Sequence, residues 1–72
     1  MNNSNVAKIQ LNGSPYKINT KTNLNQLLQE LKIQKKKVAI EVNGAIIEKE
    51  KYPKTILRKD DRVEIVHFIG GG

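Results

Sequence analysis

Hydrophobic and polar residues alternate along Ala7 to Leu11, and a second short segment with the same pattern runs from Pro15 to Ile18. Period-two alternation is typical of strands that bury one face. The Asn12-Gly13 dipeptide between the two segments is the sequence signal for a type I′ hairpin turn. The sequence therefore predicts an antiparallel hairpin near the N-terminus.

The same pattern returns in the middle of the chain. Val38 to Val42 alternates again, Asn43-Gly44 follows, and Ala45 to Ile47 is a short apolar return. These features predict a second hairpin.

Between the two hairpins, leucines recur at the spacing of one helix face, which is i, i+3, i+4 and i+7. These residues are Leu24, Leu27, Leu28 and Leu31. Asn23 suits the N-cap position, and Gln26 can reach back to complete a variant of the capping box. The pattern predicts one short amphipathic helix whose leucines belong to the core.

The last third of the chain begins with a charged stretch from Glu48 to Lys59, which we expect to be an irregular crossover with one turn of helix. Ile56 and Leu57 are expected to hold this crossover to the core. Asp60-Asp61 predicts a turn. A final strand should run from residue 62 to about residue 68.

Two hairpins with a helix between them, followed by a final strand, give a ββαββ order. This is the order of the β-grasp fold, the α+β fold of ubiquitin, in which one helix packs across a single mixed sheet. The expected core residues are Ile9, Leu11, Ile18, Leu24, Leu27, Leu28, Leu31, Val38, Ile40, Val63 and Ile65. Val66 and Phe68 are left on the solvent face of the sheet.

Length and charge limit the possible functions. A chain of 72 residues forms one domain and buries only about 60% of the surface that its unfolded form exposes.

The net charge of +6 and the pI near 9.8 would suit a polyanion-binding protein. However, the Lys35-Lys36-Lys37 run falls in a predicted connection, and aromatic residues make up only 4% of the chain, too few for a base-stacking platform. The basicity instead hints at acidic partner surfaces.

The residue types needed for an autonomous active site are scarce. There is no cysteine, and the single histidine, His67, has no second ligand candidate at a metal-binding spacing. We therefore expect no metal site and no catalytic residues of the protein's own, and we interpret His67 as a polar or partly packed strand residue.

The most informative feature is the sequence Gly70-Gly71-Gly72, directly after the apolar run that ends at Ile69. Glycine has no Cβ, so a glycine tail can enter a narrow channel and carry a carboxylate into another protein's active site. A simpler reading is that chain ends fray, or that an expression vector left a glycine scar. The absence of a polar spacer after Ile69 favours the functional reading.

The segment from Arg62 to Gly72 resembles the C-terminus of the ThiS family, the sulfur carrier proteins of thiamine biosynthesis, within the ThiS/MoaD group of ubiquitin-like proteins. The similarity extends from about Ala7 to Gly72 and includes both Asn-Gly turns and the helix from Asn23 to Leu31. The terminal diglycine is shared across the family, and the lead-in from Val66 to Gly70 is its more specific part. The polar N-terminus and the basicity depart from the family pattern.

The resemblance implies a reaction sequence. A ThiF-type adenylyltransferase would adenylate the Gly72 carboxylate with ATP and magnesium, and a cysteine desulfurase or another donor would supply sulfur to form a thiocarboxylate. Thiazole synthase, ThiG, would then use that sulfur with deoxyxylulose 5-phosphate and dehydroglycine. Gly70 and Gly71 would form the tail, and Val66, Phe68 and Ile69 would form an apolar docking patch for partners. No cofactor would be bound by the chain itself.

Three other functions stay open at this point. The small subunit of molybdopterin synthase shares the fold, the diglycine tail and the thiocarboxylate chemistry. A ubiquitin-like modifier would instead join Gly72 to a lysine through an isopeptide bond. A small basic nucleic-acid-binding module is the third.

The ends of the chain and its location are also predicted. We expect residues 1–5 to be a disordered extension, residues 6–68 to form the domain, and residues 69–72 to be a flexible tail. The polar N-terminus contains no apolar signal core, which favours a cytoplasmic protein without membrane association.

Overall fold

A computed structural model describes residues 5–69 of the chain. The predicted extension at 1–5 and tail at 69–72 fall mostly outside the described residues, so that division of the chain stays a prediction.

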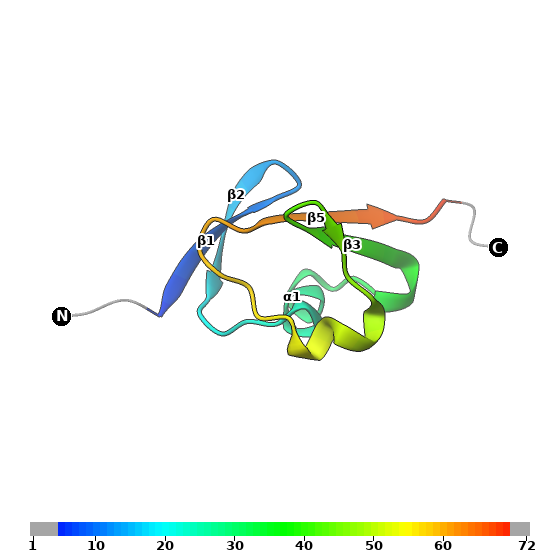
Figure 1. Ribbon diagram of the computed structural model, residues 1–72, viewed down its shortest axis with the longest axis horizontal. Helices are drawn as coiled ribbons and strands as arrows, with labels where there is room; N and C mark the ends of the chain where they lie inside the picture. Colours follow the sequence, from blue (N-terminus) through cyan, green and yellow to red (C-terminus); the bar gives the residue numbers. More distant parts are fainter. Residues whose placement is uncertain (1–4, 70–72) are drawn as a thin grey trace.

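The structure is a mixed five-stranded sheet with one α-helix packed on one face (Figure 1). The sheet order is β2-β1-β5-β3-β4, in which β1 and β5 are parallel and the other neighbours are antiparallel. This confirms the predicted β-grasp fold. The elements in chain order, with η for a 3-10 helix, are β1 (Val6–Leu11), β2 (Ser14–Asn19), α1 (Leu24–Leu31), η1 (Lys35–Lys37), β3 (Val38–Val42), β4 (Ala45–Ile46), η2 (Lys49–Lys54) and β5 (Arg62–His67).

Both predicted hairpin turns are present, and their asparagines have two roles. Asn12 and Gly13 have φ values of 49° and 85°, and Asn43 and Gly44 have φ values of 54° and 87°. Positive φ at both central residues is what a type I′ turn requires. The side-chain oxygen of Asn12 also accepts a hydrogen bond from the Ile65 N–H at 2.8 Å, and that of Asn43 accepts one from the Arg62 N–H at 2.9 Å. The two turns therefore fix β5 as well as their own strands.

Replacing Asn12 with alanine should destabilise the fold by about 1–2 kcal/mol, because the part-buried Ile65 N–H loses its acceptor and alanine disfavours positive φ. Asn12→Asp is the matched control, since it keeps an acceptor oxygen and tolerates this backbone conformation. Urea unfolding of both variants measures the difference. Equal loss in the two variants would contradict the role of the acceptor.

Helix α1 begins with the predicted capping box. The Asn23 side chain accepts from the Gln26 N–H at 2.8 Å, and the Gln26 side chain accepts from the Asn23 N–H at 2.9 Å. The helix ends at Leu31, and the C-cap residue Lys32 adopts the left-handed conformation. Three of the four predicted leucines are fully buried, and Leu31 packs against the core at its margin.

The core is close to the predicted set, with informative differences. Leu11 and Leu31 are only partly buried, whereas Tyr52 and Leu57 join the buried cluster. The expectation that Ile56 helps to hold the crossover to the core is wrong, because Ile56 is 41% exposed while Leu57 is 2% exposed. Neighbouring residues in an extended segment point to opposite sides, so only one of the two can face inward. Tyr52, carried by η2, takes the second inward position.

Two smaller expectations also changed. The crossover contains a six-residue 3-10 helix, η2, which is longer than the single turn expected, and the lysine run forms the short helix η1. The turn aspartates behave as predicted. Asp60 has a φ of 70°, and the Asp61 carboxylate accepts hydrogen bonds from the Arg58 N–H at 2.8 Å and the Asn43 side chain at 3.0 Å.

Candidate functional site

The site is built by β5, the central strand of the sheet. Its first residues pair with β1 at Gln10↔Arg62, and it pairs with β3 along its length up to Val38↔His67. One residue further, the Phe68 N–H donates to the Lys37 carbonyl at 2.9 Å. Ile69 is 97% exposed. The chain therefore leaves the sheet directly after Phe68, at the end of the molecule away from the start of β1 (Figure 1).

The apolar residues of this segment are exposed, as the sequence predicted. Val66 is 53% exposed and Phe68 is 56% exposed. Val66 pairs with Ala39 on β3, so its side chain lies on the sheet face away from the helix, where Glu64 pairs with Glu41. Val66, Phe68 and Ile69 are thus exposed apolar residues at the end of β5 and directly after it.

Ile46 adds to this face and was not predicted as a site residue. It pairs with Glu41, which in turn pairs with Glu64, so Ile46 lies on the same sheet face as Val66. Its side chain is 71% exposed. A signal for this exposure is present in the sequence, because Ala45-Ile46-Ile47 is apolar at consecutive positions and a strand at the sheet edge cannot bury both of its faces.

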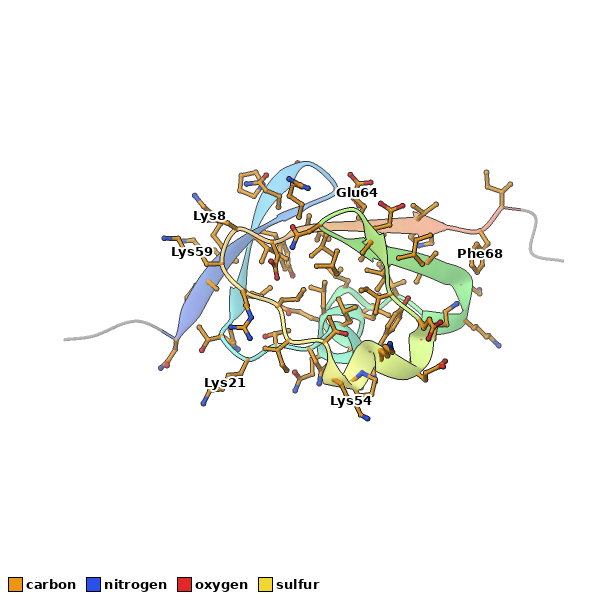
Figure 2. The ribbon with its side chains drawn as sticks, viewed as in Figure 1. Lys8, Lys21, Lys54, Lys59, Glu64 and Phe68 are labelled. Atoms are coloured by element: carbon orange, nitrogen blue, oxygen red, sulfur yellow. The ribbon has the colours of Figure 1, made fainter. Side chains whose placement is uncertain are left out.

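Lys49 of η2 was also missed. Its ammonium nitrogen lies 5.1 Å from the centre of the Phe68 ring. A cation over an aromatic face contributes about 0.5–1 kcal/mol at an exposed position. This contact orients the Phe68 ring at the end of β5, where Figure 2 shows its side chain.

The remaining candidates do not form a catalytic constellation. His67 is exposed on β5, and the Asp61 carboxylate is engaged in the turn before that strand. Across residues 5–69, no three His, Cys, Asp or Glu side chains gather as metal ligands would. Within the same range, no helix has the length and apolarity that a membrane crossing needs. Gly70, Gly71 and Gly72, the predicted tail and modification site, lie outside the described residues.

Comparison with known proteins places this geometry in a family. The ThiS family model matches residues 9–72. The sulfur carrier protein ThiS of Bacillus subtilis is 42% identical over 65 residues, which cover 89% of this chain and 98% of that protein. The crystal structure of the thiamine biosynthesis protein ThiS from Geobacter metallireducens has a TM-score of 0.79 and 34% identity, and the match covers 90% of this chain and 99% of that one.

Two other kinds of relative are similar as well. A thiazole synthase of Magnetococcus marinus is 45% identical over 65 residues, which are 90% of this chain. The chain spans only about 20% of the length of that relative. The uncharacterized protein ycf40 of Porphyra purpurea is 33% identical over the full length of both chains.

The family match covers most of the chain, and the relatives of similar length include a protein named as a sulfur carrier. The five-stranded fold with one helix agrees with that match, since it is shared with the solved ThiS structure. The chain therefore belongs to the ThiS family, the sulfur carrier proteins of thiamine biosynthesis.

Proposed function

We propose that this protein carries sulfur as a thiocarboxylate on Gly72 and delivers it for thiazole formation. The observation that carries the proposal is the end of β5. A rigid central strand presents the exposed apolar residues Phe68 and Ile69 directly before Gly70-Gly71-Gly72. The match to the ThiS family, which extends through residue 72, supports the same site.

The chemistry proceeds in two displacements. A ThiF-type adenylyltransferase, using ATP and magnesium, lets a Gly72 carboxylate oxygen attack the α-phosphorus, and pyrophosphate leaves. A sulfur nucleophile then attacks the acyl carbon of the adenylate, and AMP leaves. With hydrosulfide as donor the product is the thiocarboxylate directly. With a cysteine desulfurase persulfide, a thiol must afterwards reduce the acyl disulfide. Both displacements take place at the C-terminal carboxyl group, which glycine leaves free of side-chain obstruction.

The proposed acceptor of the sulfur is thiazole synthase, ThiG, with deoxyxylulose 5-phosphate and dehydroglycine as co-substrates. The similarity of this chain to part of thiazole synthases supports a ThiG-related partner over a molybdopterin synthase subunit. We propose a cytoplasmic location, where these partners and ATP would be found.

Intact-protein mass spectrometry tests the proposal. The protein is incubated with a ThiF-type enzyme, ATP, magnesium and sodium sulfide, and the mass should rise by the exchange of one oxygen for sulfur. Incubation without ATP is the control. If an enzyme that is active on its own carrier produces no gain here, the carrier function is contradicted, and conjugates on a denaturing gel would then support a protein modifier.

The docking role of Val66, Phe68 and Ile69 makes a separate prediction. Phe68→Ala should weaken binding to the ThiF-type enzyme by about tenfold, since truncating an exposed aromatic anchor at an interface typically costs more than 1 kcal/mol. Isothermal titration calorimetry measures the affinity. Lys54→Ala is the control, because Lys54 is exposed and points away from Phe68 (Figure 2). Unchanged affinity for Phe68→Ala would remove Phe68 from the docking patch.

A further inference from the structure

A groove lies at the opposite end of the molecule from Phe68, where the proposed sulfur chemistry does not use it. It has a volume of about 610 Å³ and is lined by the start of β1, the residues after β2 and the loop that leads to β5. Lys8, Lys21 and Lys59 all lie at this end in Figure 2. The groove can therefore be occupied while the C-terminal end of β5 is engaged elsewhere.

The charge of the groove is one-sided. Four of its lining residues are cations, namely Lys8, Lys21, Arg58 and Lys59, and none is acidic. The nearest acidic residues in sequence, Asp60 and Asp61, are in the following turn and do not line the groove. Clustered like charges in a concave surface attract ligands of opposite charge. The groove thus selects for an anionic occupant.

The backbone along one wall is an open strand edge. The Gln10 N–H donates to the Asp61 carbonyl at 2.9 Å, and the Lys8 carbonyl accepts from the Asp60 N–H at 2.8 Å. Strand β5 begins opposite Gln10 and goes no further toward the start of β1. Within residues 5–69, the next groups on this edge, the Lys8 N–H and the Val6 carbonyl, have no strand or loop to pair with. Such an edge accepts an extended peptide by strand addition.

The apolar residues that line the groove favour a peptide over a nucleic acid as its occupant. Val6 is 52% exposed and Ile56 is 41% exposed, and both line the groove. None of the lining residues is aromatic, so the groove offers no surface for base stacking. Alternating carboxylate and apolar side chains would match both the cations and the two apolar residues.

We propose that this groove binds an extended acidic segment of a partner protein, which pairs with the free edge of β1 at Val6 to Lys8 and places its carboxylates near Lys8, Lys21, Arg58 and Lys59. This inference goes beyond the sulfur-carrier function and does not depend on chemistry at Gly72. A partner held here would keep the domain bound while the opposite end is presented to an enzyme.

Fluorescence anisotropy with a labelled peptide tests the proposal. The probe is an end-capped peptide of alternating aspartate and valine, titrated with the full chain at low salt. Lys21→Glu with Lys59→Glu should weaken binding by about tenfold or more, because both cations line the groove that is proposed to hold the anionic segment. Lys36→Glu with Lys54→Glu makes the same change in net charge on exposed residues outside the groove, and should weaken binding by less than about threefold. If the groove variant does not fold, alanine replaces glutamate at the same two positions.

Two further probes decide the binding mode. A peptide of the same sequence with every backbone amide N-methylated should lose binding, since it cannot pair with the edge of β1. Equal binding of this peptide, or equal loss in the groove and control variants, overturns the proposal. A thymidine oligonucleotide that binds more tightly than the peptide, and loses affinity in the groove variant, would also overturn it in favour of a nucleic-acid site.

Discussion

Removing Gly71 and Gly72 is expected to abolish the sulfur-dependent mass gain completely, while the fold stays intact. The proposed reaction needs a carboxylate that reaches the active site of the activating enzyme, and three extended residues reach about 10 Å. Without the last two, the carboxylate would belong to Gly70, one residue beyond the exposed Ile69. The bulk of the domain would then hold it back from a narrow channel.

The same experiment contains its own stability control. Within residues 5–69, the last backbone hydrogen bond of β5 is donated by the Phe68 N–H, so the truncation removes none of the described pairing. The melting temperature of the truncated chain should therefore match that of the full chain. A full-length Lys54→Ala variant should show the normal mass gain. A truncated chain that still gains sulfur would place the acceptor somewhere other than Gly72.

Tyr52→Ala is expected to destabilise the fold by about 3–5 kcal/mol, as large-to-small changes of buried aromatic residues do. Tyr52 is fully buried and is the largest of the completely buried side chains. A domain of this size has only modest stability. The variant should be largely unfolded at room temperature, as circular dichroism and urea titration would show.

The Tyr52→Phe variant distinguishes the contribution of side-chain packing to stability from the contribution of hydrogen bonding by the hydroxyl. Within the described residues the Tyr52 hydroxyl is buried without a hydrogen-bond partner, and this burial raises its pKa. Removing an unpaired buried hydroxyl should leave stability unchanged or raise it by about 1 kcal/mol. A large loss in Tyr52→Phe would show that the hydroxyl is paired in solution.

Tyr52 also shows why sequence patterns predicted most of this core but not all of it. Leucines on one helix face and alternating residues in strands carry a periodic signal, and those residues are buried as predicted except Leu11 and Leu31, which are partly buried at the margin of the core. Tyr52 lies next to Pro53 in a charged segment with no period, so its burial depends on where η2 packs against α1 and the sheet. Tertiary placement, and not local pattern, decides such positions. The same holds for Ile56 and Leu57, which the pattern could not tell apart.

The candidate site likewise contains some residues that the sequence pattern predicted and others that it could not predict. Exposure of Val66 and Phe68 followed from the alternation of β5, because Val63 and Ile65 had to face the core. Lys49 and Ile46 could not be placed near them, since their positions depend on the path of η2 and on cross-strand register. The groove beside β1 could not be predicted from the sequence either, because its four cations come from three separate segments of the chain.

The central place of β5 has a consequence for how the protein is made. Strands β1 and β3 are neighbours only through β5, so the sheet stays in two halves until the last strand has been synthesised. Pairings such as Leu11↔Val63 join distant parts of the chain and are slow to form. A nascent chain that stops before β5 cannot complete its core. It would stay unfolded and be susceptible to quality-control proteases. Folding is thus completed by the same strand that leads directly to Phe68 and Ile69, so a molecule that has folded has already positioned the residues at which we propose that partners bind.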